Sequence, residues 1–160
     1  MEILNLATDW AKAEATTAVF FIVFGILLIT AGICFWRLGK TKMARAYIFP
    51  TLIGGALLVL LGGALFDLYY SSIEGLTIKY NSDPGAFLEK EITRTNGSIA
   101  QYKRDLYGVF PIVALIASLL IIFIKRPIWR AIFITLIALS TILLLVDSQA
   151  IATLEAYNEK

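Results

Sequence analysis

Four long apolar runs set the architecture that this chain can adopt. They cover residues 15–36, 46–66, 106–124 and 128–146, and charged side chains occur only near their ends. Each run is about as long as a helix must be to cross a bilayer hydrocarbon core of roughly 30 Å. Hydrophobic residues make up 59% of the 160 residues, which is typical of an integral membrane protein. We therefore predict an all-α, four-transmembrane-helix bundle that forms one domain over residues 1–160, with an external segment at residues 67–105.

The composition also excludes several kinds of chemistry. The chain has no histidine, which removes the commonest general base and metal ligand. Its single cysteine, Cys34, rules out an intrachain disulfide. The sequence also contains no glycine-rich phosphate-binding loop that follows a strand. We therefore predict no cofactor, no resident metal and no nucleic-acid partner, and the lipid bilayer is the first predicted partner.

Basic residues are concentrated in the two short connections between spans. Residues 37–45 carry four Lys or Arg and residues 125–130 carry three, with no acidic residue in either connection. The other seven basic residues are spread over the rest of the chain. Short loops rich in Lys and Arg face the cytoplasm. The N-terminus, the segment 67–105 and the C-terminus are then predicted to lie outside.

Small residues recur along the first two spans. Gly25 and Gly32 are seven residues apart in span one, and Gly55 and Gly62 have the same spacing in span two. Faces of small residues let two helix backbones approach closely. We expect spans one and two to form a tight antiparallel hairpin along these faces, and a homo-oligomer through the same glycines is a further prediction. Spans three and four should form a second hairpin, because residues 125–127 leave room only for a tight turn.

Local capping signals divide the remaining chain. Asp9 is a candidate N-cap for the first helix. Asp83-Pro84 is a strong helix start, with a carboxylate cap followed by proline at the first helical position. A short amphipathic helix should run from there to Asn96-Gly97, which is expected to end it. A capping box at Ser98 predicts a further helix that continues into span three, with a kink at Pro111.

One face of the short external helix carries a mixed set of side chains. Phe87, Glu91 and Arg94 recur at i, i+4 and i+7, so they lie on the same side of a helix. In one interpretation the helix is anchored on the bilayer or on the top of the bundle, and Glu91 and Arg94 form a solvated pair. In the other, this face recognises a protein partner at the outer surface.

The same segment carries a resemblance to a known family. The pattern D-P-x-x-F-L-x-x-E-x-x-R is matched by Asp83, Pro84, Phe87, Leu88, Glu91 and Arg94. Ala46-Tyr47, followed by Pro50 at the start of span two, matches as well, whereas Thr95 stands where many members have methionine. With its four spans, the chain resembles an uncharacterised family of small bacterial inner-membrane proteins. The resemblance implies a bacterial cytoplasmic (inner) membrane and no particular biochemical activity.

Three aspartates mark the predicted outer ends of the spans. Asp67 closes span two, Asp105 opens span three and Asp147 follows span four. All three are therefore expected at a similar depth, at the outer boundary of the membrane. Three arrangements are open. The aspartates form salt bridges, for example to Arg104, or are solvated separately. Alternatively, they converge in a polar site, or they bind a divalent cation. We take these aspartates with Arg104, and the external residues Phe87, Glu91 and Arg94, as the candidate binding residues. No residue is assigned a catalytic or metal-binding role.

These observations favour a binding protein over an enzyme. The chain is small, it shows no catalytic constellation, and its external helix has an apolar and charged face. Our leading hypothesis is a non-enzymatic inner-membrane binding protein with an immunity or accessory role toward a membrane-active partner. The alternatives are an oligomeric transport or channel component, which the neutral span interiors disfavour, and a membrane enzyme that uses outer-edge carboxylates.

The charge distribution yields a topology test. On a Cys34→Ala background, a cysteine introduced at Thr41 should resist an impermeant thiol reagent added from outside, because Thr41 lies in the first basic connection. A cysteine introduced at Asn81, in the external segment, should be labelled. Labelling of the Thr41 position in intact cells, with protection of the Asn81 position, would show that the orientation is the opposite of the one predicted.

Overall fold

Helices account for almost all of the structure. The computed structural model describes the backbone of residues 2–158 and the side chains of residues 5, 7–73, 75, 76, 78 and 80–152. The elements in chain order are α1 (Glu2–Leu38), α2 (Lys42–Ala46), α3 (Ile48–Ser82), α4 (Pro84–Arg104), the π-helical turn η1 (Asp105–Val109), α5 (Phe110–Phe123) and α6 (Pro127–Asn158). The predicted all-α architecture is therefore confirmed.

Four stretches of the structure are long and apolar enough to cross a membrane. They are Ala7–Leu38, Lys42–Ile73, Pro84–Phe123 and Pro127–Ala152. The chain is a multi-pass helical membrane protein. The helices continue well beyond the apolar runs at the end of the molecule that holds both termini, since α1 starts at Glu2, α3 ends at Ser82 and α6 extends to Asn158.

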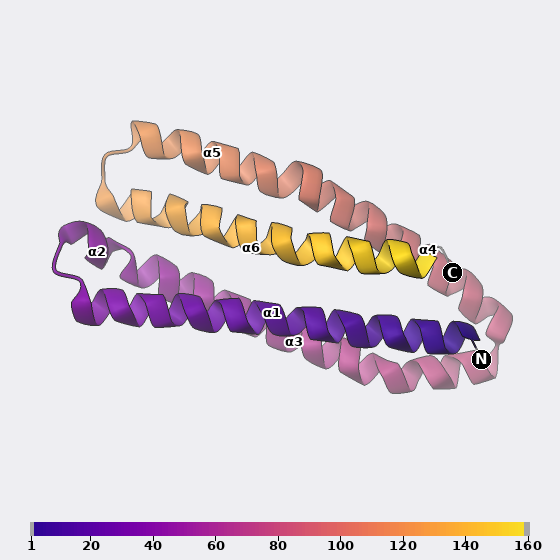
Figure 1. Ribbon diagram of the computed structural model, residues 1–160. Helices are drawn as coiled ribbons and strands as arrows, with labels where there is room; N and C mark the ends of the chain where they lie inside the picture. Colours follow the sequence, from indigo (N-terminus) through magenta and orange to yellow (C-terminus); the bar gives the residue numbers. More distant parts are fainter. Residues whose placement is uncertain (1, 159–160) are drawn as a thin grey trace.

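The helices form two antiparallel hairpins (Figure 1). The first consists of α1 and α3, which share the most extensive contact in the molecule, and the second consists of α5 and α6. Helix α6 joins the hairpins because it also contacts α1, α3 and α4, whereas α5 packs mainly on α6. The two basic connections lie at one end of the molecule, and both termini lie at the other, close to the α3–α4 junction (Figure 1). We call this second end the outer end, following the charge pattern.

Glycine brings α1 and α3 into backbone contact. A Cβ placed on Gly55 would lie 2.6 Å from the carbonyl oxygen of Gly25, and one placed on Gly25 would lie 2.7 Å from the carbonyl oxygen of Gly55. A Cβ on Gly62 would similarly lie 2.8 Å from the carbonyl oxygen of Ala18, and one on Gly32 would meet Thr51 and Leu52. The predicted tight hairpin is confirmed, and all four glycine positions are occupied by contacts within the chain.

The capping predictions have mixed outcomes. Asp83 caps α4 as predicted, because its carboxylate accepts hydrogen bonds of 3.1 Å from the backbone N–H groups of Gly85 and Ala86. Asp9 does not cap α1. It lies inside that helix, where it pairs with Lys12 at 3.9 Å.

The predicted break at Asn96-Gly97 is wrong, since α4 runs continuously from Pro84 to Arg104. Tertiary contacts hold this helix together on both sides of the glycine. Thr95 is buried before it, and Ile99 and Tyr102 after it pack on the cluster that Trp10 and Ala11 form on α1. Such packing outweighs the roughly 1 kcal/mol that glycine costs inside a helix.

The distortion expected at Pro111 takes the form of the π-helical turn η1. Proline has no N–H, so the helix cannot make the usual bond to the carbonyl of Tyr107. Just before the proline, the N–H of Phe110 bonds to the carbonyl of Asp105, five residues earlier. The extra residue in this turn rotates the faces of α5 about the helix axis relative to those of α4. A face that continues along α4 is therefore not continued by the same spacing in α5.

The glycine contact predicts a sharp difference between two glycine positions of α3. Gly55→Ala should lower the free energy of unfolding by about 1–3 kcal/mol, because the added methyl group meets a backbone oxygen that cannot move alone. Gly63→Ala is the control, since a Cβ there meets nothing within 4 Å. Thermal unfolding in mild detergent checks both variants, and equal transitions would show that the backbones of α1 and α3 are not in contact.

Candidate functional site

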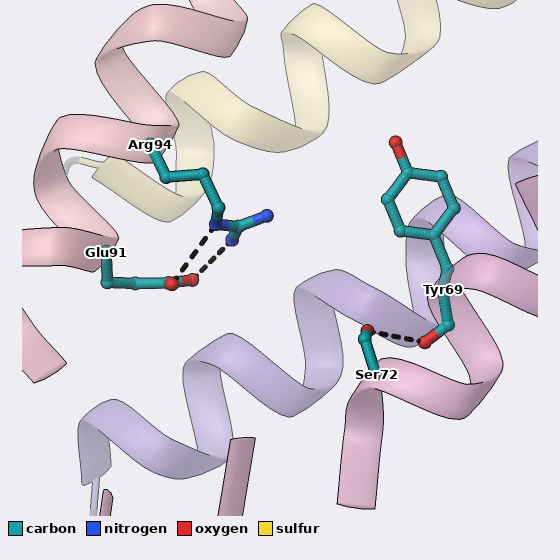
Figure 2. A network of polar contacts seen from close by, with 4 residues as sticks. All are labelled: Tyr69, Ser72, Glu91 and Arg94. Atoms are coloured by element: carbon teal, nitrogen blue, oxygen red, sulfur yellow. Dashed lines mark hydrogen bonds and ion pairs between the residues drawn. The ribbon is translucent and has the colours of Figure 1, made fainter. Parts of the chain in front are cut away.

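Helix α4 is fastened to the outer end of α1 by an arginine. The guanidinium of Arg94 forms a two-point ion pair with the carboxylate of Glu91 on the same helix, as Figure 2 shows. Its carbon Cζ lies 3.8 Å from the ring centroid of Trp10, which is a cation–π contact. The Trp10 ring in turn meets the Tyr69 ring of α3 edge-on, with centroids 5.6 Å apart. One arginine therefore connects α4 to the hairpin of α1 and α3.

The predicted recognition face of α4 points toward the molecule itself. Phe87 and Glu91 are buried, and the Phe87 ring packs edge-on against Tyr80 of α3 with centroids 5.7 Å apart. Contacts within the chain thus occupy Phe87, Glu91 and Arg94, which supports the anchored interpretation of this face. The outward face of α4 carries Leu88 and Ile92, which are exposed.

A polar cavity of about 500 Å³ opens at the outer end of the bundle. Three helices line it with residues at i, i+3, i+4 and i+7, so each contributes one continuous face. These sets are Glu14, Thr17, Ala18 and Phe21 of α1; Ser98, Gln101, Tyr102 and Asp105 from α4 into η1; and Leu143, Val146, Asp147 and Ala150 of α6. Leu61, Leu65 and Tyr69 of α3, with Phe110 of α5, complete the lining.

Carboxylates dominate the polar part of this cavity. Glu14 retains only 4% of its accessible surface and Asp147 only 8%, while Asp105 is half-buried. Asp147 interacts electrostatically with both Glu14 and Asp105, which places three acidic groups around one space. The ion pairs among the described side chains join Asp9 to Lys12, Glu91 to Arg94 and Asp105 to Arg104, so none includes Glu14 or Asp147.

The hydrogen bonding of Glu14 is incomplete. Its carboxyl group is within hydrogen-bonding reach of the Tyr102 hydroxyl, which also interacts with the Tyr69 hydroxyl. The Glu14 oxygen Oε1, however, is buried without a partner among the described residues. Arg94 is close enough to Glu14 to act on its charge, but its guanidinium is already engaged by Glu91 and Trp10. A buried carboxylate oxygen with no donor is costly, so this atom is the candidate contact point of the site.

The backbone around Tyr69 is also braced. The Ser72 hydroxyl donates a hydrogen bond of 2.7 Å to the Tyr69 carbonyl, as Figure 2 shows. This bond lies within α3, one turn beyond the cavity lining, and it supports the segment that carries the Tyr69 ring.

Two of the three predicted aspartates meet at the site. Asp105 and Asp147 both line the cavity, whereas Asp67 is exposed and lies outside it. The reason is helical phase, because Leu65 and Tyr69 point into the cavity and a residue two positions from either lies on the far side of α3. Arg104 approaches Asp105 at 3.7 Å, but its side chain is mostly exposed. The described residues include no group of acidic or cysteine side chains arranged to hold a metal ion.

Glu14 and the two tyrosines of the site were not among the binding residues predicted from the sequence. Glu14 directly precedes the first apolar run, so the span counting that selected the aspartates applies to it as well. Tyr102 lies at i+4 from Ser98 and one turn before Asp105, a spacing that places all three on one face. The interpretation of Asn96-Gly97 as a break obscured the continuity of this face. Comparison of the chain with protein-family models, curated protein sequences and solved structures finds no match.

The Arg94 contacts predict a stability effect that an exposed pair would not show. Arg94→Ala should lower the free energy of unfolding by about 2 kcal/mol, because it leaves the Glu91 carboxylate buried without its partner and removes the stacking on Trp10. Lys12→Ala is the matched control, since the Asp9–Lys12 pair has the same i, i+3 spacing but is exposed; its loss should cost no more than about 1 kcal/mol. Unfolding in mixed SDS micelles measures both, and equal effects would show that α4 is not fastened at Arg94.

Proposed function

We propose that this chain is a non-enzymatic binding protein of the bacterial inner membrane, and that the outer-end cavity is its binding site. The buried and unpartnered oxygen of Glu14 carries the proposal, because it lines a cavity of about 500 Å³ beside Asp105 and Asp147. Cavities of this size are typical of small-molecule sites, in which a few polar groups converge on an otherwise apolar lining. Such a site fits the capture of a ligand from the membrane or its outer surface.

The proposed orientation places the termini and the cavity outside. Its support is the gathering of both basic connections at the opposite end of the bundle. An accessory or immunity role is the cellular form of binding that we propose, in which the chain assists or neutralises a membrane-active partner. The exposed Leu88 and Ile92 on the outward side of α4 support a contact of that kind.

A membrane enzyme is the second candidate. The approach of Glu14, Asp105 and Asp147 to one another favours it, since carboxylates in different surroundings can divide the roles of acid and base. Tyr102 would be the nearest further proton donor, because its hydroxyl reaches Glu14. A change with time in the mass of a bound ligand would identify catalysis, whereas a binding protein returns its ligand unchanged.

Native mass spectrometry tests the binding function even when the identity of the ligand is unknown, because it detects any adduct by its mass. The full chain is extracted in polymer nanodiscs from the membrane in which it is made and is then released in the spectrometer. We expect a non-covalent adduct on the wild-type chain that is lost when Glu14→Gln is combined with Asp147→Asn.

The control variant is Asp67→Asn, which removes an acidic group near the outer end of span two but outside the cavity. This variant should keep the adduct. An adduct that is absent from the wild type, or is present equally on all three proteins, would contradict a binding site in the cavity.

A further inference from the structure

The cavity has two chemically different parts. Along the lining helices, the polar residues lie toward the outer end and the large apolar residues lie deeper, with Ala150 of α6 as a small apolar residue at the outer rim. On α1 the order runs inward from Glu14 to Phe21, and on α6 it runs outward from Leu143 to Asp147. Leu65 of α3 and Phe110 of α5 extend the deeper, apolar part. A ligand that fills both parts must be polar at one end and hydrocarbon at the other.

The polar part calls for a hydrogen-bond donor that carries positive charge. A bound cation favours the ionised form of a carboxyl group, which can only accept hydrogen bonds, and the cavity presents three carboxyl groups in Glu14, Asp105 and Asp147. The Tyr102 hydroxyl lies close to the Glu14 carboxyl group, but Oε1 of Glu14 has no partner among the described residues. The exposed Arg104 neutralises only the Asp105 side of the group. Arg94 acts on the charge of Glu14 but forms its ion pair with Glu91, so the buried acidic groups Glu14 and Asp147 retain an attraction for a cation placed between them.

A primary ammonium group fits this requirement better than a metal ion. It has three N–H donors, which suit several acceptors arranged around one space. The carboxylates are not arranged as a metal-binding group among the described residues. A metal ion would also leave the apolar part of the cavity empty. The rings of Tyr69 and Tyr102 beside the carboxylates add surfaces on which a cation is favoured.

The depth of the cavity points to a membrane amphiphile. Glu14 and Asp147 directly flank the apolar runs, so we expect them near the level of lipid head groups, while Phe21 and Leu61 lie deeper within the runs. Because α5 packs mainly on α6, the first hairpin and α5 leave room for the deeper part of the cavity between them. A hydrocarbon chain can occupy that part while its head group reaches the acidic residues.

We propose that the outer-end cavity binds the primary ammonium head group of a membrane amphiphile, with the ammonium between Glu14 and Asp147 and the hydrocarbon along Phe21, Leu65 and Phe110. The inference rests on the proposed binding function and assigns the chemical class of its ligand. The ammonium supplies the donor that Glu14 Oε1 lacks. Burial of the hydrocarbon against the apolar part of the cavity adds affinity. A soluble amine without a hydrocarbon chain would not gain that affinity.

The test uses the full chain in nanodiscs of phosphatidylcholine, to which a second lipid with the same acyl chains is added. Phosphatidylethanolamine carries a primary ammonium, phosphatidylcholine a quaternary ammonium without N–H donors, and phosphatidylglycerol no ammonium. Native mass spectrometry should show phosphatidylethanolamine retained about tenfold more strongly than either of the other two, as expected for charge-assisted hydrogen bonds. Ethylammonium added in solution should not displace it at comparable concentration.

Two kinds of variant separate the polar and apolar contributions. Glu14→Gln should reduce the preference for phosphatidylethanolamine about tenfold, while Asp67→Asn should leave it unchanged. Leu65→Trp should fill the apolar part and reduce lipid retention without changing the acidic residues. If Glu14→Gln fails to fold, Asp147→Asn is the substitute and should reduce the preference in the same way, because it removes the other carboxylate beside the proposed ammonium.

The possible outcomes are distinct. Equal retention of phosphatidylethanolamine and phosphatidylglycerol would overturn the ammonium assignment, and equal retention of phosphatidylcholine would overturn the need for N–H donors. Displacement by ethylammonium alone would show a site for soluble amines and would overturn the amphiphile. An adduct from native membranes that depends on Glu14 and resists every amine would refute this ligand class while the binding function stands. Absence of any adduct would refute both.

Discussion

The backbone contact between Gly25 and Gly55 is the constraint on which the outer end of this protein depends. It fixes α1 against α3 at a separation that no larger side chain permits. With the register of the hairpin set there, Glu14 on α1 and Tyr69 on α3 come to line the same cavity several turns away. The close approach uses one small-residue face of α3, while Gly54 on another face of that helix meets Leu139 and Thr135 of the second hairpin.

Helix α6 and the arginine of α4 complete this arrangement in different ways. Helix α6 touches α1, α3 and α4, and it brings Asp147 over the cavity from the opposite side. Arg94 secures α4 through its pair with Glu91 and its contact with Trp10. Because the guanidinium is engaged on both sides, it acts on the charge of Glu14 without forming an ion pair with that residue. The structure thereby keeps a cation and a set of carboxylates close together without pairing them.

The acidic cavity is the strongest departure from what a purely structural bundle needs. Burial of a carboxylate without a partner is unfavourable, and packing alone would be served better by an apolar residue of the same volume. Glu14 is nevertheless almost completely buried, and one of its oxygens has no donor. Sites that break the rule of satisfied polar groups are expected where a protein binds something. The position of this site at the boundary of the apolar runs connects it to the membrane surface.

By itself, the sequence determined that this chain crosses a membrane four times, because apolar length and charge placement are local properties of the chain. It also predicted the glycine contact and the Asp83 cap, each of which depends on spacings of a few residues. It did not predict the course of α4 across Asn96-Gly97, because contacts with Trp10 from a distant helix override the local signal. The tertiary structure alone decided that Glu14 joins Asp105 and Asp147 while Asp67 faces away. The position of a residue relative to the end of an apolar run gives its depth in the membrane. Only the packing of the helices sets which way its side chain points.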